Sequence, residues 1–240
     1  MTIATESVLA VPRRALFRGD WPHGFSRLSG DRAAQVLRRL ADLGRFVPRS
    51  TAEHDPDLKQ PIPYCVVASD ARWFCVERLS AQGETRLHGR LSIGIGGHVG
   101  PADGHPSGGP ALFEAALLRE LREELPLPEA LPRPVFLGLV NDESDAVGRV
   151  HVGLVYALRL PPGAAVEVRE IRKHRGGFRH LVGPLGLWQD FTRLESWSAL
   201  LLSDLRGTTA VEQAGREGST DTYVREETDD GRAQDPQAVP

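Results

Sequence analysis

The sequence predicts an α/β domain, because segments with the composition of strands alternate along the chain with segments of helical periodicity. The clearest helical pattern covers residues 110–125 and has one apolar and one acidic face. Runs rich in β-branched and aromatic residues lie on both sides of it and indicate hairpins. A chain of 240 residues, 40% of them hydrophobic, can bury one sizeable core around these elements.

The overall charge narrows the kinds of partner that the chain can have. A formal net charge of -3 and a pI near 6.3 give no basic field for nucleic acid or for acidic membranes. The first residues do not read as a signal peptide and no long apolar run follows, so we expect a cytoplasmic protein without membrane contact. Cys65 and Cys75 are too few for a disulfide framework and are expected to be buried. The expected partner is a small molecule, and a homodimer is left open.

Residues 1–60 are expected to form an N-terminal arm and helix that pack on the core. Up to Gly30 the scattered aromatic residues among glycine and proline indicate an irregular arm. Asp31 is placed to cap a helix that Gly44 ends. The apolar residues of this helix that should face the core are Ala33, Val36, Leu37, Leu40 and Leu43. The sequence therefore predicts an N-terminal helical extension to the core.

A polar segment connects this helix to the first predicted hairpin. It carries Arg49, Glu53 and Asp55, which we interpret as a solvated loop, with the border of a substrate pocket as the alternative. Residues 60–63, Gln-Pro-Ile-Pro, are expected to form a surface loop or an extended entry into a strand.

Three strands are predicted between this entry and the acidic helix. Residues 64–67 and 73–76 form a hairpin across the turn composition of residues 69–72, and residues 92–97 form the next strand. Gly96 and Gly97 allow the backbone to approach a phosphate or a helix closely, although such runs are as often plain turns. His98 follows directly and is a candidate substrate contact, with a purely structural histidine as the alternative.

The acidic helix begins after Gly108-Gly109-Pro110 and is stopped by Pro126. Its apolar face is formed by Leu117, Leu118, Leu121 and Leu125. Residues three and four apart share a helix face, so Glu120, Glu123 and Glu124 are neighbours on the other side.

Clustered carboxylates repel one another unless a positive charge lies among them, and a divalent cation would supply it. Oxygen ligands without Cys or His in register suit Mg2+ or Mn2+ rather than zinc, and Mg2+ is commonly bound together with substrate phosphates. The pattern therefore predicts phosphoryl chemistry at Glu120, Glu123 and Glu124. The alternative is a solvated helix face, which is typical of surface helices.

The chain after this helix returns to strand composition. Residues 135–140 and 150–158 are predicted strands around a polar loop, in which Glu143 is a candidate contact to metal or ribose and a solvated hairpin tip is the alternative. Residues 165–171 are predicted as a further strand carrying Glu167 and Glu170. An amphipathic helix is expected over 191–205, and residues 207–240 have the composition of a disordered tail.

The order Gly96-Gly97-His98, a loop, and then Arg119-Glu-Leu-Arg-Glu-Glu124 resembles the Nudix hydrolase family. The box of that family is Gly-x5-Glu-x7-Arg-Glu-U-x-Glu-Glu-x-Gly-U, where U is aliphatic. The residues that match in register are Arg119, Glu120, Leu121, Glu123, Glu124 and Leu127. The N-terminal half departs: His105 stands for the opening Gly, Ala111 for the first Glu, and Pro126 for the second Gly.

The resemblance covers about residues 61–202 and implies an α/β/α sandwich with a mixed sheet, with residues 61–206 as the Nudix domain. The Gly-Gly-His element resembles a bacterial subgroup. In the family the missing Glu is thought to pair with the Arg, and Glu114 is an off-register substitute here. Arg119 is expected to orient a carboxylate, while Glu120, Glu123 and Glu124 hold Mg2+ (or Mn2+).

The resemblance also implies a distant carboxylate that acts as a further metal ligand or general base, for which Glu170 is the candidate. Residues 175–178 resemble the turn before the closing strand of the family.

The expected function is metal-dependent hydrolysis of a diphosphate linkage in a nucleoside diphosphate joined to another group. Two alternatives stay open: a non-catalytic nucleotide-binding module, and a diphosphate isomerase, whose acid/base pair often includes a Cys.

Overall fold

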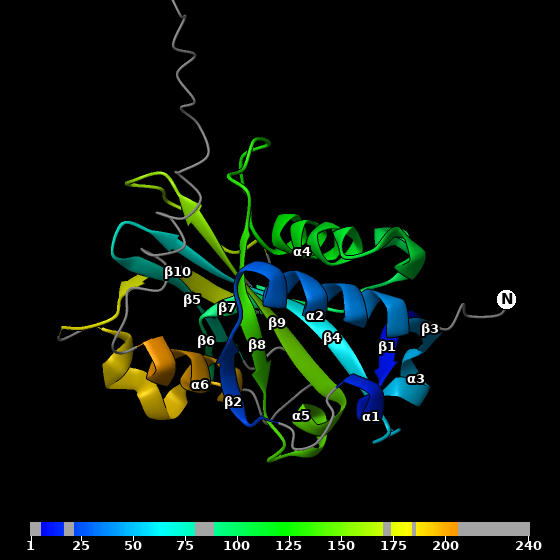
Figure 1. The fold of residues 1–240 in the computed structure, drawn as a ribbon. Coiled ribbons are helices and arrows are strands. Elements are labelled where there is room, and N and C mark those ends of the chain that lie inside the picture. Colours follow the sequence, from blue (N-terminus) through cyan, green and yellow to red (C-terminus); the bar gives the residue numbers. More distant parts are fainter. Residues whose placement is uncertain (1–5, 17–21, 80–88, 170–173, 184–185, 206–240) are drawn as a thin grey trace, which may run out of the picture.

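A computed structural model describes residues 6–16, 22–79, 89–169, 174–183 and 186–205. Figure 1 shows a twisted sheet with helices on both of its sides. The mixed α/β fold predicted from the sequence is confirmed. Glu170 and the predicted tail at 207–240 lie outside the described residues.

Most of the predicted elements are present, with several additions. The strands are β1 Ser7–Pro12, β2 Gly24–Arg27, β3 Arg45–Pro48, β4 Leu58–Ser69, β5 Arg72–Arg78, β6 Leu91–Ser92, β7 Gly94–Gly96, β8 Val135–Asn141, β9 His151–Leu160 and β10 His174–His180. The α-helices are α1 Arg13–Leu16, α2 Gly30–Leu43, α3 Arg49–Ala52, α4 Ala111–Glu124, α5 Ala146–Val150 and α6 Ser196–Leu205. Short 3-10 helices are η2 Pro101–Asp103, η3 Pro106–Gly108 and η4 Leu187–Arg193.

The strand order along the sheet is β10-β5-β4-β9-β8-β2, with β7 and β1 also paired to β4. Strand β4 runs parallel to β9 and antiparallel to β5, β7 and β1, so the sheet is mixed. The central place of β4 explains why almost all of its side chains are buried.

Strand β4 contains the Gln60–Pro–Ile–Pro segment, so the extended entry and not the surface loop is correct. On the side away from β9, β4 pairs with β1 at Leu58 and Lys59 and with β7 from Tyr64 onward. Pro61 and Pro63 fall between these two partners. A proline has no N–H to donate to the hydrogen-bond ladder. At the gap between β1 and β7 the missing N–H therefore removes no ladder hydrogen bond.

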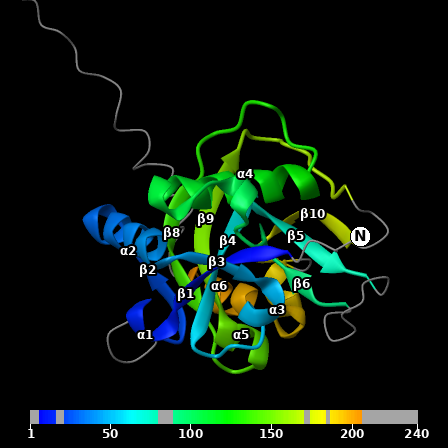
Figure 2. The ribbon, with the colours of Figure 1, turned by 90° about the vertical axis from the view of Figure 1, so that its right-hand side faces the viewer.

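Two apolar clusters cover the two faces of the sheet. One joins α2 and α4 to side chains such as Cys65 and Leu154, and the other joins η4 and α6 to side chains such as Tyr64 and Val155. Figure 2 shows α4 and α6 on opposite sides of the strands. This alternation along β4 and β9 follows from the two-residue period of a strand.

The N-terminal helical extension is a correction to the prediction. The helix itself is present as α2, but the described chain begins with strand β1, and the arm predicted to be irregular forms β1 and β2. Strand β2 pairs with β8 at the edge of the sheet, and β1 pairs with both β3 and β4. These short strands carry a weak local signal, because pairing with distant strands and not composition stabilises them.

Four further segments also differ from their predictions. Residues 165–169 form no strand, and residues 175–178, expected as a turn, lie inside β10, which pairs with β5. The helix predicted from residue 191 begins only at Ser196, after η4. The strand predicted at 92–97 is interrupted at Ile93 into β6 and β7. Within the described ranges, none of the helices is long and apolar enough to cross a bilayer.

Leu121, on the apolar face of α4, is fully buried in the cluster beneath the helix. Leu121→Ala is expected to cost about 2–5 kcal/mol of unfolding free energy, because it leaves a cavity between helix and sheet. Urea denaturation measures this loss. A cost below about 1 kcal/mol would mean that α4 is not packed as the structure has it.

Candidate active site

Helix α4 places the predicted acidic residues on one side and its leucines on the other. It begins after Pro110 and ends at Glu124, and the backbone is extended at Leu125 ahead of Pro126, as the sequence predicts. Its buried residues are Leu112, Phe113, Ala116, Leu117 and Leu121. The exposure of the acidic residues differs: Glu120 and Glu124 are partly buried and Glu123 is exposed.

Arg119 is the centre of a polar network at this helix. Its guanidinium donates two hydrogen bonds to Asp103, at 2.7 Å to Oδ1 and 3.0 Å to Oδ2. It also donates to Glu120 Oε1 at 2.8 Å and to the backbone oxygen of His98 at 2.9 Å, and it lies 3.4 Å from Glu123. The hydrogen bonds to Asp103 raise the pKa of Arg119 further above its usual range. Arg119 therefore fixes two carboxylates and the Gly-Gly-His loop in one arrangement.

The two glycines of the loop allow close approaches. A Cβ at Gly97 would overlap the Glu120 carboxylate, and a Cβ at Gly96 would overlap the backbone oxygen of Pro63. The glycines thus bring the loop against both the acidic helix and strand β4. Burial raises the pKa of Glu120 above its usual value, and the Glu123 and Asp103 carboxylates add to this while Arg119 opposes it.

A second group of charged side chains lies near the C-terminal end of α4. Arg78 on β5 donates to Glu195 Oε1 at 2.5 Å. Burial by itself would lower the pKa of Arg78, but the Glu195 and Glu124 carboxylates hold it above its usual range. Arg169 donates from its side chain to the backbone oxygens of Arg122 and Leu125, and its backbone N–H donates to the backbone oxygen of Glu124. Arg169 therefore caps the C-terminal end of α4, and residues 165–169 do not extend the sheet.

The side chain of His98 belongs to a separate group with Glu53 and His151. Among the described residues, these three are the group of His, Cys, Asp and Glu whose ligand atoms all lie within 4.8 Å of one another. The three carboxylates of α4 do not converge in this way. Burial, with smaller contributions from Arg49 and His151, lowers the pKa of His98 to about 3, and burial also lowers the pKa of His151. Both imidazoles are therefore neutral near pH 7.

Glu143 forms ion pairs with two cations outside α4. It lies 2.7 Å from Lys59 Nζ and 2.6 Å from Arg13 Nη2. Lys59 is fully buried and also donates to Asn141 Oδ1, Gly148 O and His151 O at 2.7–2.9 Å. The predicted polar loop is thus tied to strand β4 through a buried lysine.

Two similarities decide the family. Protein YmaB of Bacillus subtilis (strain 168) is 38% identical to this chain over 202 residues, which cover 83% of the chain and 97% of YmaB. The crystal structure of Tm1382, a candidate Nudix hydrolase, matches with a TM-score of 0.67 at 28% identity, and the match covers 84% of this chain and 99% of Tm1382. This chain belongs to the Nudix hydrolase family.

A third similarity is weaker. A MutT NUDIX hydrolase from Burkholderia pseudomallei is 25% identical over 60% of this chain and 98% of its own, with a TM-score of 0.40. At that TM-score it adds nothing to the assignment. No model of a known protein family matches the chain, in keeping with the departures in the first half of its Nudix box.

The structure places a carboxylate at the Nudix arginine although the box Glu is absent. Asp103 on η2 is that partner, and its side chain is 2% exposed. Glu114, the off-register substitute, instead lies 3.3 Å from the exposed Arg133. A signal for Asp103 is present in the sequence: the loop from Gly97 to Ala111 is longer than usual, and Asp103 is the carboxylate within it.

Local sequence patterns give a weaker functional signal for the other residues near this Nudix site. The polar composition around Glu53 predicts only a solvated loop, and His151 is predicted only as a strand residue. Their meeting with His98 depends on the parallel pairing of β4 with β9, which no local pattern predicts.

Proposed function

We propose that this chain is a metal-dependent pyrophosphohydrolase that cleaves a diphosphate linkage in a nucleoside diphosphate joined to another group. The observation that carries the proposal is the Arg119 network. Asp103 completes it despite the degenerate first half of the box, so the arrangement of charges around the arginine is retained. The products are a nucleoside monophosphate and a phosphorylated remainder.

The donors on α4 fit Mg2+ or Mn2+. Glu120, Glu123 and Glu124 offer hard oxygen atoms within one turn of helix, and Mg2+ needs only one or two carboxylates when phosphates and waters complete its shell. The raised pKa of the partly buried Glu120 also favours a neighbouring positive charge. When bound, the cation neutralises diphosphate oxygens and activates water.

The residues of the chain hold this arrangement in place. Arg119 orients Glu120 and Glu123, and Asp103 fixes Arg119 with two hydrogen bonds. Gly97 lets the Gly-Gly-His loop lie directly against Glu120. A carboxylate is needed to accept the proton of the attacking water, and Glu170, next in sequence to Arg169, stays the candidate.

The buried thiols argue against the isomerase alternative. Cys65 and Cys75 are both buried. Burial raises the pKa of Cys75 to about 11 and that of Cys65 still higher. Neither thiol is therefore suited to exchange protons with a substrate near pH 7.

A substrate screen tests the proposal. The full chain is incubated with nucleotide sugars, dinucleotide cofactors, dinucleoside polyphosphates, diphosphoinositols and nucleoside triphosphates, each with Mg2+ and with Mn2+. We expect a nucleoside monophosphate from at least one substrate of the first three classes, no product after exhaustive treatment with a general chelator, and recovery on adding Mg2+. Full activity in the chelated protein contradicts the metal-dependent mechanism. Tight nucleotide binding without product supports the non-catalytic module instead.

A further inference from the structure

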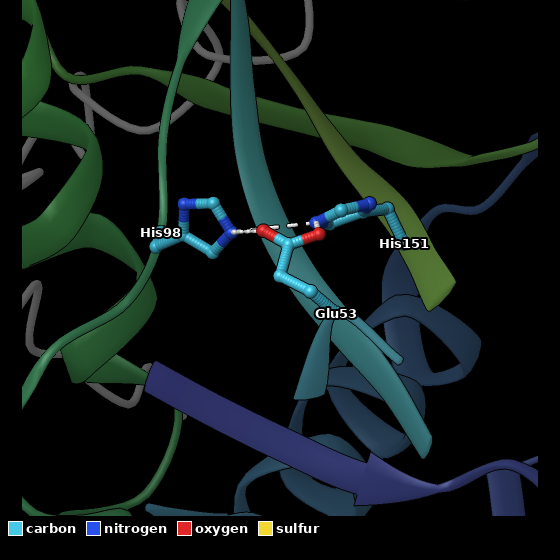
Figure 3. A group of neighbouring side chains, drawn as sticks. All are labelled: Glu53, His98 and His151. Atoms are coloured by element: carbon cyan, nitrogen blue, oxygen red, sulfur yellow. Dashed lines mark hydrogen bonds and ion pairs between the residues drawn. The ribbon is translucent and has the colours of Figure 1, made fainter. Parts of the chain in front are cut away.

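Glu53, His98 and His151 come from three separate parts of the chain and point at one another. Glu53 follows α3, His98 follows β7, and His151 is the first residue of β9. Figure 3 shows the Glu53 carboxylate directed between the two imidazole rings. All three side chains are largely withdrawn from solvent, with exposures of 28%, 19% and 8%. We call these residues the His2Glu cluster.

The distances within the His2Glu cluster are close to those between ligands of one metal ion. The two Nε2 atoms are 3.3 Å apart, Glu53 Oε1 lies 3.7 Å from His98 Nε2, and Glu53 Oε2 lies 4.0 Å from His151 Nε2. In a tetrahedral zinc site, with bonds of about 2.0–2.2 Å, neighbouring ligand atoms lie about 3.3–3.6 Å apart. The imidazoles already have that spacing, and because one ligand atom from each of the three residues lies within 4.8 Å of the others, the carboxylate has to move closer to reach it.

The surroundings orient His151 as a ligand. Its Nδ1 lies 2.8 Å from the backbone oxygen of Val147. A carbonyl oxygen only accepts, so Nδ1 carries the hydrogen and Nε2 presents its lone pair to Glu53 and His98. Metal-bound histidines are commonly held by such a bond from the other ring nitrogen. Arg49 Nε, 3.3 Å from Glu53 Oε1, similarly positions the carboxylate.

The strand position beside His151 holds a buried polar side chain, that of Gln60. It is fully buried, and neither its amide nitrogen nor its amide oxygen has a hydrogen-bond partner within the part of the chain that the structure describes. Gln60 is the register partner of His151, so the two side chains leave the same face of the sheet. An unsatisfied buried amide costs about 1–3 kcal/mol and calls for a partner such as a water or a ligand.

We propose that Glu53, His98 and His151 bind a zinc ion, with the fourth position open to water or an added ligand. Two imidazole nitrogens and one carboxylate form one of the donor sets that zinc uses when a position stays open. Nitrogen donors favour zinc over magnesium, whereas the carboxylates of α4 favour magnesium. The chain thus has two metal sites of different chemistry, joined through His98, whose backbone oxygen is bound by Arg119.

The competing explanation needs no metal. His98 can donate an Nε2–H bond to the lone pair of His151, and Glu53 is then held by Arg49. That arrangement leaves the cluster with no affinity for zinc beyond that of ordinary surface histidines.

The test measures metal binding to the metal-free full chain. Calorimetry measures the binding of Zn2+, and visible spectra measure the binding of Co2+ as a probe. We expect one tight equivalent of Zn2+ and a rise in melting temperature with Zn2+ that Mg2+ does not reproduce. Glu53→Gln and His151→Asn should each weaken this binding by at least the 10–100-fold that loss of a supporting residue costs. These outcomes do not depend on hydrolase activity.

The matched control is His54→Gln, because His54 is exposed and directly follows Glu53 in the sequence. It should bind Zn2+ like the unaltered chain, and Glu123→Gln on α4 should do so too. Glu53 is partly exposed, so Glu53→Gln is expected to fold even if His151→Asn does not. Zinc affinity that is unchanged in Glu53→Gln, or absent from the unaltered chain, overturns the proposal.

Discussion

Glu123→Gln and Glu124→Gln are each expected to lower the turnover number by about 100-fold or more, which corresponds to about 2.7 kcal/mol of transition-state stabilisation. Both substitutions keep the shape of the side chain and remove one charge from the acidic face of α4. If these carboxylates hold the divalent cation, the loss occurs in the chemical step. Steady-state kinetics on a substrate identified by the screen measures the effect.

The free energy of unfolding distinguishes a loss of metal binding from a general disturbance of the fold. The Glu123 side chain is 57% exposed, and an exposed pair such as Glu123–Arg119 contributes at most about 1 kcal/mol. Glu123→Gln should therefore unfold close to where the unaltered chain does. The matched control is Glu114→Gln on the same helix, which should keep full turnover. Normal metal-dependent turnover in both Glu123→Gln and Glu124→Gln would show that the acidic face is only a solvated helix surface.

Lys59→Met is expected to have the largest effect on stability, about 3–5 kcal/mol. Lys59 is fully buried, and its ammonium group binds three oxygen acceptors together with the Glu143 carboxylate. Methionine fills a similar volume but donates nothing, so a carboxylate and several acceptors lose their partner. The lysine holds the ends of β8 and α5 to β4, so we expect the loss to unfold this corner first.

Arg13→Met is the matched control, because Arg13 pairs with the same carboxylate from a position 24% exposed. It should cost roughly 1 kcal/mol or less. Urea denaturation of both variants gives the comparison. Equal losses of unfolding free energy in the two variants would mean that the burial of Lys59 does not strengthen its interaction with Glu143.

The ion pairs of Glu143 with Lys59 and Arg13 predict that the stability of the fold depends on pH in the acid range. Burial by itself would raise the pKa of Glu143, but Lys59 and Arg13 outweigh it and hold the pKa below its usual value. A carboxyl group whose pKa is lower in the folded state stabilises the fold above its unfolded pKa, about 4.3, and loses that contribution as the pH falls through the folded pKa. The free energy of unfolding should therefore fall with acid below about pH 4, and less steeply in Glu143→Gln.

The sequence determined those features that depend on neighbours in the chain. The apolar and acidic faces of α4 follow from spacings of three and four residues, and proline at both ends set its limits. The hairpin of β4 and β5 follows from strand composition around a turn, where Asp70 adopts a positive φ of 54° that aspartate tolerates. The α/β class and the Arg-Glu pattern of the box therefore follow from local sequence alone.

Only the tertiary structure decided which distant residues meet. Asp103 reaches Arg119 across 16 residues, His98 meets His151 across 53, and Lys59 binds Asn141 across 82. Strands β1, β2 and β10 were missed for the same reason, because each is stabilised by a partner far along the chain. Periodicity and capping report local geometry, whereas a buried ion pair or a convergent ligand set exists only after the sheet has fixed its register.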